Sequence, residues 1–211
     1  NVTIIEGRFD INGSIIVEEN ATLILRNAIL NFAQTEDYEF NMTFWNPAIG
    51  NPRLQVDNAT ITSNDYYQGI FLYENSSAQI DGLTTVKSRF FLEDSSLTGF
   101  SNSFLSWGIF AMNNATLNAC NSSIQYIWAW DKSSVNVSNS TIASYVDIFA
   151  QSANLSIIGL RPGHVSFWSF QDNCSVVVAP NGLVSNVVLE NTDIGNWSFE
   201  WQGLALSLIH I

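Results

Sequence analysis

The sequence predicts an all-β solenoid, in which short parallel strands stack as the rungs of one coil. The clearest observation is a tandem repeat: residues 113–124 (NNATLNACNSSI) and 131–142 (DKSSVNVSNSTI) follow one pattern, eighteen residues apart. A fixed period near twenty residues is typical of solenoids. The second observation is the alternation of apolar and polar residues in each copy, which indicates strands. The third is the abundance of Ser, Thr, Asn and β-branched residues, which disfavours helices.

Eight copies of this pattern align when one apolar strand position is taken as the anchor. The anchors are Leu23, Leu54, Ala78, Leu97, Leu117, Val135, Leu155 and Val176. The residue two places later is apolar or glycine in every copy, and the residue between is mostly polar, as expected for a strand of period two. An antiparallel sandwich would not keep such columns, because hairpins reverse the strand direction. We therefore predict parallel rungs.

A sharp bend is predicted four places after each anchor. Most residues there are Asn or Gly, which tolerate the left-handed backbone conformation that such a bend requires. The column contains Asn27, Asn58, Gly82, Ser101, Asn121, Asn139, Gly159 and Pro180. Stacked Asn side chains can also hydrogen-bond from one rung to the next.

A second strand precedes the anchor in most copies and is rich in aromatic residues, as in GIFLY at 69–73, RFFL at 89–92 and YIWAW at 126–130. The alignment places four rings in one column: Phe71, Phe90, Phe110 and Trp128. One interpretation is a stacked core column, because large rings pack well on neighbouring rungs. The other interpretation is an aromatic platform for sugars.

These repeats, with their Asn bends and aromatic strands, resemble right-handed parallel β-helix proteins of the pectin-lyase-like class, of the secreted and cell-surface type. Segments such as NGSIIVEENATLILRNAIL and VDNATITS carry the resemblance, which spans roughly residues 11–194. It implies a single-stranded β-helix of about eight to ten rungs. It also implies a class that includes polysaccharide lyases, glycoside hydrolases, adhesins and structural surface proteins.

The expected organisation is one β-helix over residues 1–205, with an inserted loop at 31–51. Insertions in solenoids map to loops on one face, often the binding face. The insertion supplies three candidate carbohydrate-binding residues, Tyr38, Phe44 and Trp45. A packed cover over the core is the alternative. Residues 206–211 (LSLIHI) resemble a translated sequencing adapter, so we expect a non-native tail on a metagenomic fragment of a longer chain with further rungs or domains.

The chain is acidic: seven Lys and Arg stand against nineteen Asp and Glu, for a net charge of −12. The clustered basic residues that bind nucleic-acid phosphates are missing, so nucleic acid is not an expected partner. No run is long and apolar enough to span a bilayer. We expect an extracellular or cell-surface location, with a carbohydrate or another cell-surface protein as partner.

Asn-x-Ser/Thr triplets are frequent, and thirteen occur in the chain. They indicate either a glycosylated secreted surface or a by-product of the repeat, because Asn and Ser/Thr suit its turns. The candidates for glycosylation are Asn20, Asn41, Asn58, Asn75, Asn114, Asn121, Asn136, Asn139, Asn154, Asn173 and Asn196.

One pair of carboxylates is a candidate for catalysis. Asp57 and Asp81 fall in one column beside Arg26, on rungs about 4.8 Å apart. Two carboxylates flanked by a cation are similar to a general acid and base pair, and the resemblance to the pectin-lyase-like class implies hydrolases with clustered Asp residues. However, Asp-Asn and Asp-Gly are also ordinary turn dipeptides.

A second acidic column contains Glu74 and Glu93, with Asp94 beside them. Acidic side chains on adjacent rungs repel one another unless water or a cation separates them. The column is therefore interpreted either as a calcium site or as a solvated turn. No other cofactor is expected.

The function expected from the sequence is a structural or adhesive cell-surface module that is not an enzyme. Its solvent-facing strand positions are mostly Ser, Thr, Asn and Gln, rather than the carboxylate and basic clusters that cleave sugars. The alternatives are a polysaccharide-active enzyme using Asp57 and Asp81, and a carbohydrate-binding module using the 31–51 insertion and exposed rings.

Overall fold

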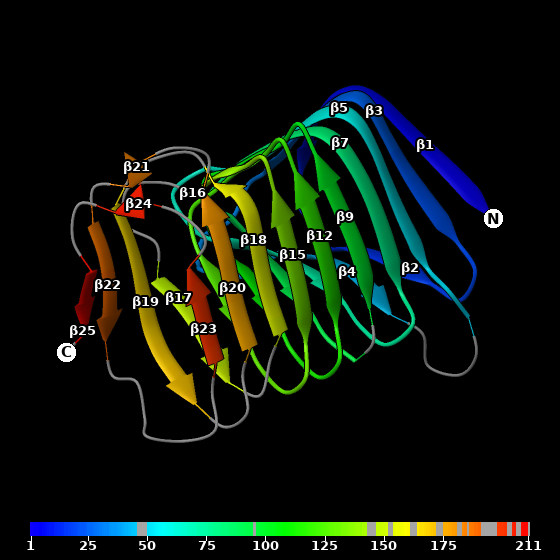
Figure 1. The fold of residues 1–211 in the computed structure, drawn as a ribbon. Coiled ribbons are helices and arrows are strands. Elements are labelled where there is room, and N and C mark those ends of the chain that lie inside the picture. Colours follow the sequence, from blue (N-terminus) through cyan, green and yellow to red (C-terminus); the bar gives the residue numbers. More distant parts are fainter. Residues whose placement is uncertain are drawn as a thin grey trace.

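The computed structural model is an all-β chain whose parallel strands stack into a solenoid (Figure 1). It describes residues 1–45, 50–94 and 96–142, and after these the strands that lie between 147 and 210. Side chains are described up to residue 141 and at Ser156 and Ile157. The described residues contain no helix, and residues 1–142 wind through about seven turns. The predicted fold class is confirmed.

Two long parallel sheets form the walls of the coil. Sheet A has the order β1 (Val2–Ile11), β3 (Thr22–Phe32), β5 (Arg53–Ser63), β7 (Ser77–Val86), β9 (Leu97–Ser101), β12 (Thr116–Cys120), β15 (Ser134–Ser138), β18 (Asn154–Leu160), β20 (Ser175–Pro180) and β23 (Ser198–Trp201). Beside its later strands lie β10 (Phe104–Leu105), β13 (Ser123–Ile124) and β16 (Thr141–Ile142).

Sheet B forms the opposite wall. Its order is β2 (Ile15–Glu18), β4 (Met42–Trp45), β6 (Gln68–Leu72), β8 (Ser88–Leu92), β11 (Ile109–Ala111), β14 (Ile127–Ala129), β17 (Asp147–Gln151), β19 (His164–Gln171), β22 (Asn186–Glu190) and β25 (Leu208–His210). A short pair, β21 (Leu183–Val184) and β24 (Leu204–Ala205), lies apart from both sheets.

The core lies between the two sheets and is filled by the predicted anchor column. Leu23, Leu54 and Leu117 are at most 3% exposed, and register pairs Leu23 with Leu54 and Leu117 with Val135. Side chains alternate between core and solvent along each strand, because successive residues of a strand point to opposite faces. The alternation seen in the sequence therefore separates core from surface.

The fourth rung corrects the predicted alignment by one residue. Thr98, not Leu97, is paired with Ala78 and Leu117 in the anchor column. Thr98 is fully buried, whereas Leu97 is 52% exposed. A one-residue slip moves a side chain to the other face of the sheet, so Phe100 takes the inner position assigned to Gly99. The next apolar position is occupied by Leu105 rather than Phe104, which is 50% exposed.

The bend in sheet A is made by residues in the left-handed conformation, as predicted. They are Asn27, Asn58, Gly82, Asn102, Asn121 and Asn139, with φ between 45° and 66°. Asn102 replaces the predicted Ser101, which follows from the same slip. Nδ2 of Asn58 donates a hydrogen bond to Oδ1 of Asn27 at 2.9 Å. The Asn residues of the repeat are therefore required by backbone geometry, because few other side chains tolerate positive φ.

A ladder of buried serines supports the inner side of this bend. Ser103, Ser122 and Ser140 each donate a hydrogen bond of 2.8 Å to the carbonyl oxygen two residues earlier. The Oγ atoms also accept, each from the backbone N–H one rung earlier: Ser140 from Ser122, Ser122 from Ser103, and Ser103 from Leu83, all at 3.2 Å. Because unpaired polar groups are costly to bury, the ladder explains the recurring Asn-Ser dipeptide.

Candidate ligand-binding face

The candidate catalytic residues lie together on the outer face of sheet A. Arg26, Asp57 and Asp81 occupy one column and border a hollow of about 240 Å³. The Nη1 atom of Arg26 is 3.4 Å from Oε1 of Glu6, and its Nε is 3.9 Å from Oδ2 of Asp57. Such exposed ion pairs contribute at most about 1 kcal/mol. The column assignment from sequence is therefore right, and the cation is shared between two carboxylates.

Asp81 is held as a carboxylate rather than as an acid. Its Oδ1 accepts hydrogen bonds from Nδ2 of Asn102 at 2.7 Å and from Oγ of Ser101 at 2.8 Å. These two hydrogen bonds lower the pKa of the Asp81 carboxyl below its ordinary value. A general acid needs a raised pKa at neutral pH, so this geometry disfavours the acid role.

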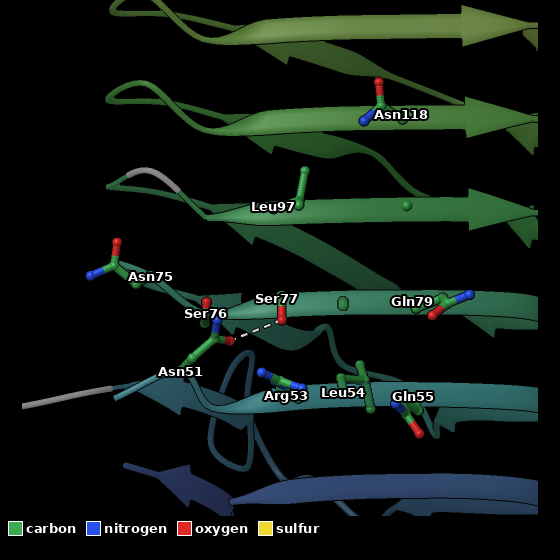
Figure 2. A pocket seen from close by; sticks show the side chains of 12 residues that line it. Asn51, Arg53, Leu54, Gln55, Asn75, Ser76, Ser77, Gln79, Leu97 and Asn118 are labelled. Carbon is green, nitrogen blue, oxygen red and sulfur yellow. Dashed lines mark hydrogen bonds between the residues drawn. The ribbon is translucent and has the colours of Figure 1, made fainter. Parts of the chain in front are cut away.

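A larger hollow continues along sheet A and is lined mainly by amides and hydroxyls (Figure 2). Its volume is about 600 Å³, and its lining includes Asn51, Arg53, Gln55, Ser77, Gln79 and Asn118. Oγ of Ser77 donates to Oδ1 of Asn51 at 3.0 Å. The lining holds no carboxylate or imidazole, so it offers hydrogen bonds but no acid–base pair.

The predicted pairing of Glu74 with Glu93 is wrong by one residue: these residues lie in turns between the sheets, where the pairing of Leu72 with Leu92 puts Glu74 level with Asp94 and Glu93 level with Tyr73. Glu74 and Asp94 have φ of 51°, so their positions are set by the backbone of the turn, and Glu93 lies one residue earlier. The residues that the structure describes contain no group of three or more His, Cys, Asp or Glu side chains arranged to hold a metal ion. Burial raises the pKa of Glu93, and the neighbouring Asp94 raises it further.

The raised pKa of Glu93 predicts a small pH effect on stability. Because the folded state favours the protonated carboxyl, its contribution is present below the ordinary pKa of 4.5 and is lost as the pH rises through the raised value. Glu93→Gln should therefore gain stability relative to the parent protein between pH 4 and pH 7, by about a few tenths of a kcal/mol, because solvent screens this partly buried group. Urea unfolding at both pH values measures it, and a pH-independent difference would contradict it.

The most distinctive surface of the described chain is the outer face of sheet B, which carries a ladder of rings. Phe71, Phe91 and Phe110 are paired in register on β6, β8 and β11. Their centroids are 4.6 and 4.9 Å apart, with interplanar angles of 9° and 19°. Phe90, which the sequence alignment placed in this column, is buried in the core and packs edge-on against Phe100. The observed column therefore contains Phe91 where Phe90 was predicted, and it lies on the outer face of sheet B rather than in the core.

The parallel stacking of the ring ladder ends at Trp128. Phe110 and Trp128 meet with their planes at 81° and their centroids 4.0 Å apart. In the preceding steps each ring face is covered by its neighbour, which is worth about 0.5–1.5 kcal/mol per pair but leaves only edges for a ligand. Around Trp128 the rings no longer form one parallel stack, because Trp130 also packs against both Phe110 and Trp128.

A second group of rings lies beside this ladder, and the inserted loop contributes Tyr38 to it. Tyr38 lies 6.1 Å from the ring of Phe91, and Tyr67 packs edge-on against Trp107 at 4.8 Å. Trp107 in turn stacks on Tyr126 at 5.9 Å and 30°. Burial raises the pKa of the Tyr38 hydroxyl, although Arg89 opposes the shift. Tyr38 of the insertion therefore joins a ring group whose other members lie in the segments that precede β6, β11 and β14.

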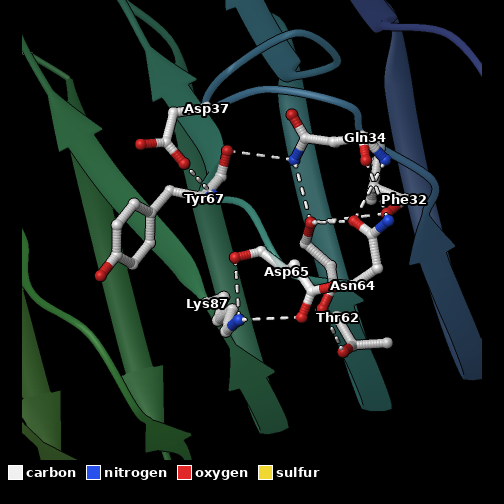
Figure 3. A network of polar contacts seen from close by, with 9 residues as sticks. Phe32, Gln34, Asp37, Thr62, Asn64, Asp65, Tyr67 and Lys87 are labelled. Atoms are coloured by element: carbon white, nitrogen blue, oxygen red, sulfur yellow. Dashed lines mark hydrogen bonds and ion pairs between the residues drawn. The ribbon is translucent and has the colours of Figure 1, made fainter.

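A polar network fastens the insertion to the solenoid (Figure 3). Gln34 is only 2% exposed, and its Nε2 donates to Oγ of Ser63 and to the carbonyl of Tyr67, both at 3.1 Å. Nδ2 of Asn64 donates to the Gln34 carbonyl at 2.9 Å, and Oδ1 of Asp37 accepts from the Tyr67 N–H at 2.8 Å. These bonds fix two loops to each other, and so fix Tyr38 and Tyr67.

Arg89 lies among these rings. Its guanidinium carbon is 4.4 Å from the ring centroid of Tyr67, 5.4 Å from that of Trp107 and 5.9 Å from that of Tyr38. Its Nη1 donates a hydrogen bond of 2.6 Å to the Tyr38 hydroxyl. Cation–π contacts of this kind are worth about 0.5–2 kcal/mol. Arg89 therefore joins the inserted loop to the aromatic face.

A hollow opens where this group meets the ladder. Its volume is about 230 Å³, and its lining is Arg89, Trp107, Gly108, Phe110, Tyr126 and Trp128. The backbone bonds of β11 place Gly108 between Arg89 and Tyr126. A Cβ at Gly108 would lie 2.7 Å from Cβ of Tyr126, so the position excludes a side chain. The hollow exists because this place in the outer column is a glycine.

The three carbohydrate-binding candidates from the insertion lie in three different environments. Tyr38 lies in the ring group around Arg89. Phe44 is fully buried in the core, so it cannot contact a ligand, because alternation turns it inward. Trp45 is 42% exposed and lies outside the hollow. The sequence analysis missed Arg89, Trp107 and Tyr126; the available signal was Gly108, a glycine that directly precedes the aromatic strand β11 and lies level with Arg89 and Tyr126.

Most of the candidate glycosylation sites are exposed Asn side chains. Asn20, Asn58, Asn75, Asn114, Asn121, Asn136 and Asn139 are exposed. Asn41 is half-buried, and its amide donates to the Tyr38 carbonyl and accepts from the Gly69 N–H. Asn173 and Asn196 lie outside the described residues, as does the side chain of Asn154.

No protein-family model, curated protein or solved structure matches this chain. Across the part of the chain that the structure describes, no helix has the length and apolar character needed to cross a bilayer. The function of the outer face of sheet B therefore has to follow from the geometry of its own residues.

Proposed function

We propose that this chain is an extracellular, non-catalytic β-solenoid module that attaches to surface glycans through the hollow around Gly108. The single observation that carries the proposal is this opening in an aromatic face, lined by four rings and one guanidinium. Aromatic rings present a flat apolar surface, and the edge groups of Tyr and Trp supply hydrogen bonds. A sugar ring has the matching character, with an apolar C–H face and polar hydroxyls.

The size of the hollow favours a single sugar unit. Pockets for drug-sized ligands measure roughly 300–1,000 Å³, and this hollow is about 230 Å³. The neighbouring Phe71–Phe91–Phe110 ladder offers only ring edges, so binding is concentrated at Gly108. The hydrogen bond between Arg89 and Tyr38 fixes the Arg89 side chain in the wall of the hollow before a ligand binds. This reduces the entropy lost on binding.

Two further observations support an adhesive role over hydrolysis. The carboxylates of Asp57 and Asp81 lie on the other sheet, where Asp81 is hydrogen-bonded as an anion. The outer strand faces of sheet A carry amides and hydroxyls. The acidic composition, the frequent Asn-x-Ser/Thr triplets and the resemblance to secreted pectin-lyase-like β-helix proteins support the proposed extracellular location.

A glycan array followed by calorimetry tests the proposal. The 211-residue chain should bind one or more oligosaccharides, and Trp107→Ala should weaken binding at least tenfold, since central aromatic residues dominate such contacts. Trp45→Ala is the matched control: it removes a partly exposed Trp outside the hollow and should leave affinity unchanged. An equal loss in both variants, or no bound glycan, would contradict the proposal.

A further inference from the structure

Arg89 has hydrogen-bond donors that its contacts with Tyr38, Tyr67 and Trp107 do not use. The guanidinium has five N–H donors in a planar fork, and the structure gives it one hydrogen bond, to the Tyr38 hydroxyl. Within the described ranges, no carboxylate lies at ion-pair distance from it, although Arg26 and Lys87 both have acidic partners. This cation also lines the hollow around Gly108.

Its surroundings strengthen an interaction with an anion. Arg89 is half-buried against Tyr67 and Trp107, so a bound anion would be partly shielded from water. Charge-assisted bonds from a guanidinium to a carboxylate or a sulfate-type oxyanion are frequently bidentate and about twice as strong as neutral ones. A neutral sugar would leave this capacity unused.

We propose that the hollow selects a glycan carrying one acidic sugar, whose carboxylate or sulfate ester is bound by Arg89 while its ring packs beside Trp107 and Tyr126. This inference rests on the proposed glycan-binding function and adds the charge of the bound unit. It assigns Arg89 as the specificity-determining residue.

The charge of the protein restricts the ligand to a single anionic unit. The net charge of −12 repels a long polyanion, and the hollow holds one cation. Asp37 is bonded to the Tyr67 N–H on one side. Glu93 lies on the other side, four residues from Arg89 and so roughly 13 Å along the strand. An acidic sugar within a neutral glycan fits this pattern, whereas a polyuronate places further charges near these carboxylates.

Calorimetry with matched oligosaccharides tests this specificity. The probes are one neutral oligosaccharide, the same chain ending in a hexuronic acid, the same chain with one sulfate ester, and a polyuronate. At least one singly charged form should bind about tenfold more tightly than the neutral form, and the two arms identify the anion. The polyuronate should bind no more tightly per site than the neutral form.

Variants then assign the preference to a residue. Arg89→Gln should abolish the tenfold preference, so that charged and neutral glycans bind this variant with equal affinity, and Arg53→Gln, which removes an exposed Arg on sheet A, should leave the preference unchanged. If Arg89→Gln fails to fold, Arg89→Lys should reduce the preference, and in the parent protein the preference should fall as NaCl rises from 50 to 500 mM. Equal binding of charged and neutral glycans by the parent protein overturns the inference and leaves the proposed function intact. No binding of any form overturns both.

Discussion

Replacing Leu117 by Asp is expected to unfold the solenoid. Leu117 has no exposed surface and lies in the centre of the core column, paired with Thr98 and Val135. A buried, unpaired charge costs several kcal/mol, which is comparable to the total stability of a typical domain, about 5–15 kcal/mol. Thermal unfolding followed by circular dichroism measures the effect.

The neighbouring residue provides the control. Asn118 is exposed on the outer face of the same strand, and its Oδ1 accepts a hydrogen bond from Asn136. Asn118→Asp keeps that acceptor, so it should shift stability by no more than about 0.5 kcal/mol. If Leu117→Asp melts at the parent temperature, the assignment of this column to the core is wrong.

Phe44→Ala is expected to destabilise the protein by about 3–5 kcal/mol, since it removes a fully buried ring. Trp45→Ala, one residue later, removes a ring that is 42% exposed and should cost much less. Urea unfolding of the two variants compares adjacent aromatic residues that differ in the face to which they point. Similar losses in both would contradict the alternation on β4.

The sequence was sufficient to predict the fold because burial, alternation and bend geometry repeat from rung to rung in residues 1–142. The fourth rung was misaligned because hydrophobicity favoured Leu97 over Thr98 as the anchor. The bend column identifies the correct register, because only an anchor at Thr98 places Asn102 at the bend, where φ is 50°. A positive φ restricts residue choice more strictly than burial does, so the bend should determine the register.

The candidate site was predicted less well, for two physical reasons. RFFL contains adjacent Phe residues, and alternation alone does not tell which one faces outward; the inward positions of Ser88 and Leu92 decide for Phe91. The contact between Tyr38 and Arg89 joins residues 51 positions apart. That contact depends on how the insertion folds back, which local patterns do not encode.

The most direct test of the central claim is a crystal structure of the chain with an oligosaccharide selected by the array. We predict one sugar ring in the hollow at Gly108, in contact with Trp107 and Tyr126, with its acidic group at Arg89. A sugar bound instead on sheet A, beside Gln79 and Asn118 or across Asp57 and Asp81, would contradict the account.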